Sequence, residues 1–336
     1  MGGSHAALLQ AEHFAVEVSH PGWRRRYTGC RVREKMGSLS GVDWNESRNQ
    51  PRVPMQSAPR TSESPILVLG ASGKTGRRVA DRLEARGIPV RRASRSADPA
   101  FDWNDEAGWD AVLNGIRAIY ITYAPDLAMP GATDAIRELV RRAACHDVEH
   151  LVLLSGRGEK EAQLCEDIVI SGGIPWTIVR ASWFFQNFSE GAFVSMVQAG
   201  VITLPAGDVP EPFVDVDDIA DVVVRSLTEP GHEGELYEVT GPRSLTFRQA
   251  AEELSKAAGR EIRFLSVPHD AFVEEARVSG TPKEVVWMLD YLFSTVLDGR
   301  NVETSNGVQR ALGRPPRDIA QYAQDVARTG VWDPVQ

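Results

Sequence analysis

The fold is decided by one stretch, Ile66-Leu67-Val68-Leu69-Gly70-Ala71-Ser72-Gly73-Lys74-Thr75-Gly76. An apolar run typical of a buried strand leads into three glycines at GxxGxxG spacing, after which a helix begins. Gly70 permits the tight turn, Gly73 lets a pyrophosphate approach the backbone, and Gly76 allows the helix to pack closely on the strand. Because the N–H groups and the dipole at a helix start favour an anion, the stretch predicts a dinucleotide-binding turn. The expected cofactor contacts in it are Gly70, Ala71, Ser72, Gly73, Lys74, Thr75 and Gly76.

The run Gly73-Lys74-Thr75 also resembles the end of a nucleotide-hydrolysing P-loop. That motif needs a glycine five residues before Gly73, and the residue there is Val68, so we reject it. A glycine-rich turn without a ligand is the other alternative. The strand before it and the helix after it favour dinucleotide binding.

Short apolar runs alternate with amphipathic helical stretches from residue 65 onward. This alternation predicts an α/β fold with a Rossmann-like, doubly wound parallel sheet. We expect strands at residues 66–69, 90–93, 118–122, 150–155 and 176–179, with helices at 75–86, 106–113, 133–145 and 160–171. Later helices are expected at 184–198, 217–227, 246–258, 269–278, 283–297 and 318–327, with a further strand at 236–239. We expect a cofactor-binding core over residues 63–182 and a smaller, partly helical substrate-binding region over 183–336, part of which returns to the core sheet.

Composition excludes several classes of protein. The 336 residues are 42% apolar and 25% charged, as in ordinary globular proteins, and no apolar run approaches the length of a membrane span. A net charge of -9 argues against nucleic acid as a partner, since phosphate contacts need a basic surface. Cys30, Cys145 and Cys165 show no metal-ligand spacing, so we expect no metal site. We expect a cytoplasmic monomer or homodimer whose partner is a small-molecule substrate.

Residues 1–62 mix Pro, Gly, Ser, Asn and Arg without sustained periodicity. Such a segment buries too little apolar surface to offset its chain entropy, which predicts a disordered N-terminal extension. A basic interaction arm is the alternative.

The second expected strand indicates which coenzyme binds. Selectivity for NAD usually places Asp or Glu at the end of this strand, on the ribose 2′-hydroxyl. Here the sequence reads Val90-Arg91-Arg92-Ala93-Ser94-Arg95-Ser96, without a carboxylate. Arg95 can pair with a 2′-phosphate and Ser94 can donate to it, so we expect NADP(H) in preference to NAD(H).

Further cofactor contacts are expected where later strands end. Phe101-Asp102-Trp103 follows a very short expected strand, and Asp102 can either accept from the adenine amino group or cap a turn. Carboxyl ends of strands border the crevice of an open sheet. We therefore expect Thr122, Tyr123, Ala124 and Pro125 to face the ribose and nicotinamide.

Residues 65–330 resemble the atypical short-chain dehydrogenase/reductase superfamily, in its NmrA-like branch, and within it most resemble the ergot-alkaloid festuclavine and agroclavine dehydrogenases and their bacterial relatives. The segments that carry the resemblance are 70–76, 94–95, 151–157, 171–188, 213–220 and 312–316. The resemblance implies that Ser155 and Gly156 lie beside the nicotinamide. It also implies that residues 181–184 (Ala181, Ser182, Trp183 and Phe184) cover the nicotinamide ring. Arg180-Ala181 departs from the more usual Arg-Pro, which loosens this contact.

The catalytic acid of typical short-chain reductases is missing. Those enzymes use a YxxxK pair, in which the ammonium lowers the phenol pKa. None of the six tyrosines is followed by lysine four residues later: Tyr27, Tyr120, Tyr123, Tyr237, Tyr291 and Tyr322. An iminium substrate needs no such acid, because hydride addition leaves a neutral amine.

The leading hypothesis is an NADP(H)-dependent oxidoreductase that transfers hydride to an iminium, carbonyl or quinone-like substrate. Its candidate catalytic residues are Ser155, Tyr123 and Glu166, although Glu166 can equally be an exposed helix residue. Trp287 and Tyr291, four apart on one helix face, are candidates for stacking on a cation or for core packing. The alternative is a non-catalytic NADP(H)-binding redox sensor or regulatory protein.

Overall fold

Six parallel strands form the central sheet of the protein. The computed structural model describes residues 64–191 and 193–334, and the extension expected over residues 1–62 lies outside them. In spatial order β2-β1-β3-β4-β5-β7, the strands are β2 (Val90–Ala93), β1 (Ile66–Leu69), β3 (Ala118–Ile121), β4 (His150–Gly156), β5 (Trp176–Ala181) and β7 (Glu235–Val239). The chain runs outward from β1 to β2 and then crosses back to β3. The switch point of the sheet therefore lies between β1 and β3, where ligands bind in open α/β sheets.

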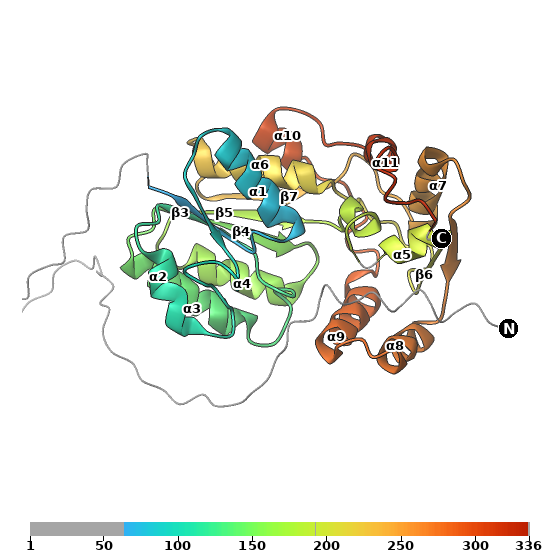
Figure 1. The fold of residues 1–336 in the computed structure, drawn as a ribbon, viewed down its shortest axis with the longest axis horizontal. Helices are drawn as coiled ribbons and strands as arrows, with labels where there is room; N and C mark the ends of the chain where they lie inside the picture. Colours follow the sequence, from blue (N-terminus) through green and yellow to red (C-terminus); the bar gives the residue numbers. More distant parts are fainter. Residues whose placement is uncertain (1–63, 192, 335–336) are drawn as a thin grey trace, which may run out of the picture.

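Helices cover both faces of this sheet (Figure 1). One face carries α1 (Lys74–Ala85), α6 (Val216–Thr228) and α10 (Gly307–Leu312). The other carries a 3₁₀ turn (Glu106–Gly108), α2 (Trp109–Leu113), α3 (Ala132–Cys145) and α4 (Lys160–Ile170).

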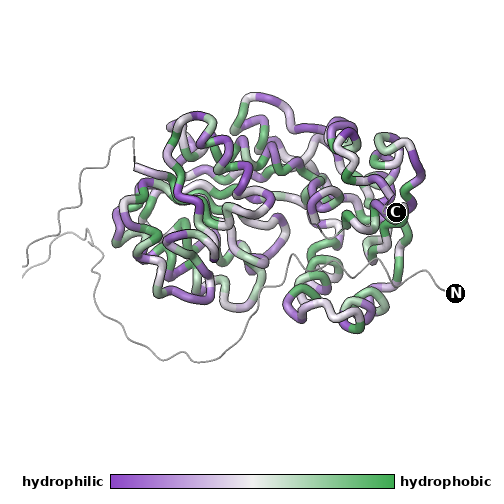
Figure 2. The backbone as a smooth tube through the Cα atoms, viewed as in Figure 1, coloured by the Kyte–Doolittle hydropathy of each residue, from purple (hydrophilic) through white to green (hydrophobic). Residues whose placement is uncertain are grey.

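Side chains of β1 show how the two layers form. Leu67 and Leu69 pack with α2, α3 and α4, whereas Ile66 and Val68 pack with α1 and α6. Successive strand residues point to opposite faces, so a strand covered on both sides must be apolar throughout. Figure 2 shows hydrophilic and hydrophobic residues alternating along the surrounding helices, as amphipathic elements require.

Beyond the carboxyl ends of the strands lies a smaller layer (Figure 1). Its elements are a 3₁₀ turn (Phe185–Phe188), α5 (Val194–Gln198), β6 (Val201–Leu204), α7 (Phe247–Ala258), β8 (Arg263–Ser266), α8 (His269–Val278), α9 (Lys283–Tyr291), a π-helical turn (Leu292–Val296) and α11 (Ile319–Ala327). Strands β6 and β8 pair in parallel as a separate two-stranded sheet. Phe247, fully buried at the start of α7, packs edge-on against Phe213 with ring centroids 5.0 Å apart.

Two local predictions differ from the structure. The helix expected over residues 184–198 is broken into the 3₁₀ turn and α5. The structure has no strand between β2 and Phe101, and Asp102 forms an isolated bridge with Asp105. The N-cap of α6 is Asp215, whose carboxylate accepts from the Asp217 backbone N–H at 2.8 Å. Among the described residues, no helix is both long and apolar enough to cross a membrane.

Arginines of α1 hold that helix against α6. Arg78 and Arg82 both bind Asp217, at 3.2 and 2.5 Å, and Arg82 also binds Asp221 at 2.9 Å. Arg78 binds Glu190 at 2.5 Å as well. These partly buried, shared ion pairs form a network, which stabilises more than isolated surface pairs do. The network fixes the direction in which α1 points.

We predict that Gly76→Ala destabilises the protein by about 1–3 kcal/mol, the usual cost of overpacking. A Cβ at Gly76 would lie 2.2 Å from the Gly70 carbonyl oxygen, a backbone atom that cannot move aside alone. Urea unfolding without coenzyme measures the loss. Ser72→Ala, at an exposed position of the same turn, is the control and should change the midpoint little. An unchanged midpoint in Gly76→Ala would show that helix and turn are not in tight contact.

Candidate functional site

The glycine turn after β1 lies at the switch point and contacts the end of β3. Gly70 adopts a left-handed φ of 64°, and the Gly73 N–H donates to its carbonyl at 2.8 Å. A Cβ at Gly70 would lie 2.3 Å from the Thr122 hydroxyl, which itself donates to the Leu69 carbonyl at 2.9 Å. Position 70 therefore requires glycine on two grounds, and Thr122 ties the ends of β1 and β3 together.

Helix α1 starts directly from this turn, with its N-terminus towards the switch point. Gly73 is the N-cap and supplies no side-chain acceptor, so the first N–H groups of α1 have no side-chain cap. Burial lowers the pKa of Lys74, the first residue of the helix. The residues expected to contact the diphosphate, 70–76, form one continuous turn, in which a Cβ at Gly70 would clash with Thr122 and a Cβ at Gly76 with the Gly70 carbonyl oxygen. The turn fits an adenine dinucleotide.

The arginines of the second strand have different roles. Arg91 donates to the Val112 and Asn114 carbonyls at 2.7 Å, and Arg92 binds Asp81 and Glu84. Arg95 is exposed, and within residues 64–191 and 193–334 it has no hydrogen-bond or ion-pair partner. Ser94, just before it, lies 3.2 Å from the Ser96 hydroxyl. Of the three arginines, Arg95 alone keeps its guanidinium available to an anion.

Asp102 and Trp103 lie close to Tyr123. The Asp102 carboxylate accepts from the Asn104 backbone N–H at 2.9 Å, the turn-capping role that the sequence left open. Its other oxygen accepts no hydrogen bond from the described residues. Trp103 packs on Tyr123 with ring centroids 4.8 Å apart. The aromatic wall joins the segment after β2 to the end of β3, where Ala124 and Pro125 follow.

Ser155 and Glu166 belong to a buried polar network. Ser155 at the end of β4 donates to Glu166 at 2.6 Å, and Arg180 of β5 donates to both oxygens of that carboxylate, at 2.9 and 2.5 Å. Arg180 also binds Glu238 of β7 at 2.9 Å. Glu166 is 2% exposed, so it is not a surface residue of α4. Glu166 fixes the direction of the Ser155 hydroxyl. Because Arg180 neutralises the Glu166 carboxylate, that carboxylate offers no free charge to a ligand.

The segment after β5 passes from the sheet to the smaller layer. Arg157, next to Gly156, donates its N–H to the Ala181 carbonyl at 3.0 Å, so β4 and β5 end together. The buried Ser182 hydroxyl has no partner among the described residues. Trp183 packs on Phe293 with centroids 5.2 Å apart, and Phe184 bridges to Val214. Together they connect the sheet edge to the aromatic core of the smaller layer.

Two aromatic residues of α9 lie parallel to each other. The rings of Trp287 and Tyr291 are stacked, with centroids 5.4 Å apart and an interplanar angle of 4°. Trp287 is 37% exposed, so the pair is not part of the core. The Tyr291 hydroxyl donates to Glu161 at the start of α4. This contact brings α9 over the loop that follows β4.

No pattern in the sequence indicated two acidic residues in that region, Asp126 and Glu159. Glu159 lies in the loop between β4 and α4 and is 6% exposed. A Cβ at Gly156 would lie 2.1 Å from a Glu159 carboxyl oxygen, so this side chain covers the Gly156 backbone. Its carboxyl group hydrogen-bonds that of Asp126. No short motif signals the pair, because the two residues come from different loops.

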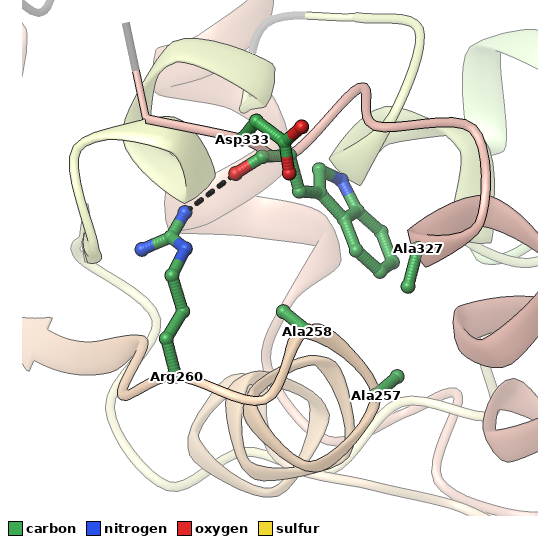
Figure 3. A pocket seen from close by; sticks show the side chains of 6 residues that line it. Ala257, Ala258, Arg260, Ala327 and Asp333 are labelled. Carbon is green, nitrogen blue, oxygen red and sulfur yellow. Dashed lines mark hydrogen bonds between the residues drawn. The ribbon is translucent and has the colours of Figure 1, made fainter. Parts of the chain in front are cut away.

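A hollow elsewhere on the protein does not belong to this site. It measures about 90 Å³ and lies between the end of α7 and the C-terminal residues (Figure 3). Arg260 at its edge donates to the Trp332 carbonyl at 2.8 Å and to the Val197 carbonyl at 2.6 Å. The arginine therefore holds three chain segments together. The hollow is too small for a dinucleotide.

Two family models match this chain. The model of the NAD(P)H-binding family matches residues 70–230, and that of the NmrA-like family matches residues 162–322. Together they span the glycine turn, the ends of β4 and β5, and most of the smaller layer.

Similar proteins share nearly their whole length with this chain. The (4-alkanoyl-5-oxo-2,5-dihydrofuran-3-yl)methyl phosphate reductase of Streptomyces griseus is 31% identical, over 78% of this chain and 98% of its own. Agroclavine dehydrogenase of Claviceps fusiformis is 29% identical, over 80% and 98%. The Citrobacter triphenylmethane reductase structure, complexed with NADP(H), shares the fold with a TM-score of 0.66 and 18% identity, over 78% of this chain and 99% of that one. The chain therefore belongs to the NmrA-like family of NAD(P)H-binding oxidoreductases.

Proposed function

We propose that the protein is an NADP(H)-dependent reductase that transfers hydride to a small organic substrate of the iminium, carbonyl or quinone class, without a Tyr–Lys acid pair. The observation that supports this proposal is the glycine turn at the switch point, where Gly70 contacts Thr122. The start of α1 has no side-chain cap there, so its N–H groups are available to a diphosphate. Bound there, the coenzyme supplies hydride.

Preference for NADP(H) is supported by the end of β2. Arg95 is the arginine there with no carboxylate or carbonyl partner among the described residues. Arg91 binds backbone carbonyls and Arg92 binds carboxylates of α1. A guanidinium pairs with phosphate through charge-assisted hydrogen bonds, and Ser94 beside it adds a hydroxyl donor.

On the substrate side, we infer that the ends of β3 and β4 face the reacting atoms. Tyr123 and Trp103 form an aromatic wall there, and Glu166 holds the Ser155 hydroxyl in one direction. Burial raises the pKa of Tyr123, so its phenol stays protonated at neutral pH and can donate a hydrogen bond. Residues 183–336 would supply the rest of the substrate-binding region, with Trp183 and Phe184 over the nicotinamide.

We predict that Gly73→Glu abolishes coenzyme binding while the fold survives. The new side chain would fill the approach to the helix N-terminus and place a negative charge against the diphosphate. Quenching of NADPH fluorescence measures binding, and thermal unfolding reports the fold. Ala85→Glu adds the same charge at the exposed far end of α1 and should bind normally. Normal binding by Gly73→Glu would place the diphosphate elsewhere.

We predict that the parent protein binds NADPH more tightly than NADH, and that Arg95→Glu reverses or abolishes this preference. The substitution replaces attraction to the 2′-phosphate by repulsion, worth roughly tenfold or more in affinity. Fluorescence titration with both coenzymes gives the ratio. Arg86→Glu, an exposed charge reversal at the other end of α1, is the matched control. Equal affinities in the parent would refute a 2′-phosphate site at Arg95.

We predict that the protein oxidises NADPH with at least one member of a panel of cyclic iminiums, quinones, aldehydes and azo compounds. Absorbance of NADPH gives the rate, and product analysis confirms a two-electron reduction. A sensor or regulatory protein would bind NADP(H) tightly and turn over none of them. That result would replace the reductase by the non-catalytic alternative.

A further inference from the structure

Asp126 and Glu159 form a pair of acidic groups at the carboxyl ends of β3 and β4. Asp126 follows Pro125 in the loop after β3, and Glu159 comes just before α4. Glu159 is 6% exposed and lies against the Gly156 backbone, at the position proposed to border the nicotinamide. Its Oε2 atom is buried and has no hydrogen-bond partner among the described residues. A buried carboxyl oxygen without a partner is unusual, since such groups are nearly always satisfied.

The two carboxyl groups differ in what supports a negative charge. Burial raises the pKa of Asp126 as well, but its carboxylate accepts from the Ala128 backbone N–H at 2.8 Å, which acts against that rise. Glu159 has no such donor, and burial together with the charge of Asp126 raises its pKa well above the usual range. The pair therefore holds a proton, with Glu159 as the donor of the hydrogen bond to Asp126.

Charged and titratable groups around Glu159 reinforce this state. Glu161 and Glu166 of α4 lie nearby, and both raise the pKa of Glu159. Glu166 is already bound to Arg180, and Glu161 accepts from Tyr291 of α9. The nearby Cys165 thiol stays neutral, because burial raises its pKa to about 12. No arginine or lysine of the described residues forms an ion pair with Glu159, so nothing on the protein side stabilises its anion.

We propose that Glu159, held in place by Asp126, is the proton donor of the reaction and replaces the missing Tyr–Lys pair. This inference rests on the proposed function and names the catalytic acid of the same site. The substrate carbonyl carbon would gain a hydride from bound NADPH, which would leave as NADP⁺. The π electrons of the C=O bond move to oxygen, which takes the Glu159 proton. Glu159 becomes a carboxylate and regains a proton from water in the next cycle.

A built-in acid also selects the substrate class. An iminium becomes a neutral amine when it gains hydride and needs no proton, whereas a carbonyl or quinone develops negative charge on oxygen. A protonated carboxyl group beside that oxygen stabilises the negative charge that develops there in the transition state. The reduction of an iminium gains nothing from it, because no negative charge develops. The natural acceptor is therefore an uncharged carbonyl or quinone-like compound.

Glu159→Gln tests the proposal, because the amide keeps the shape and removes the transferable proton. We expect the kcat for an aromatic aldehyde to fall about 100-fold, within the usual range for loss of a general acid. The rate with a cyclic iminium and the affinity for NADPH should stay within about twofold, since neither depends on a proton donor. Asp167→Asn, on the exposed side of α4, is the control and should match the parent.

A second readout does not depend on turnover. At pH 7 the difference spectrum of the parent minus Glu159→Gln should show the infrared band of a protonated carboxyl group, shifted in heavy water. Glu211, whose pKa burial raises to about 7, contributes to both proteins and cancels in the difference. If the difference spectrum lacks this band, the acid role is wrong even when the protein reduces its substrates. If Glu159→Gln does not fold, Asp126→Asn takes its place and should shift the same band. An unshifted band in that variant would refute the pairing.

The remaining outcomes separate this inference from the proposed function. Equal slowing of aldehyde and iminium by Glu159→Gln would show that the pair shapes or charges the site and donates no proton. Turnover of iminiums alone by the parent would reject the acid and keep the reductase. Turnover of no acceptor would overturn the reductase itself, and the donor role with it.

Discussion

The close approach of two backbone segments, the turn at Gly70 and the first turn of α1 at Gly76, is the constraint on which the site depends. No Cβ fits at Gly76, because the Gly70 carbonyl oxygen would lie 2.2 Å away. This contact sets how near the helix axis comes to β1, and the ion pairs of Arg78 and Arg82 with α6 set its direction. Together they leave the positive end of α1 at the switch point. Thr122 then joins the end of β3 to the same place.

The sheet could be predicted from sequence because its strands are buried on both faces. A strand such as Ile66–Leu69 must be apolar at every position, and that run is visible without an alignment. The expected helix at residues 184–198 was wrong for a tertiary reason. Phe188 and Phe193 both insert into the aromatic core of the smaller layer, at ring centroids 5.6 Å apart, and the chain breaks its helix to reach it. Strand β8 was missed because most of its residues are exposed, so no apolar run marks it.

The candidate site residues also fall into two groups: those marked by a local sequence pattern and those that depend on contacts between distant segments. The glycine turn is a local constraint, written within seven consecutive residues, so sequence alone identified it. Glu166 could be surface or site in the sequence, and its burial follows from Arg180, which arrives from the next strand. The pairing of Asp126 with Glu159 depends on two loops meeting at one sheet edge. A contact of that kind has no signature in a single sequence.

The electrostatics of the strand ends explain how a reductase can work without tyrosine and lysine. In a Tyr–Lys pair a cation makes a weak acid stronger, and the phenol can then give up its proton. Here the stronger acid is already present, and burial among other carboxylates keeps it protonated. Burial also raises the pKa of Glu211, to about 7, while the charge of Arg157 acts to lower it. Glu159 instead shares its proton with Asp126 and lies on Gly156, so the acid is held where negative charge would develop on a reduced oxygen.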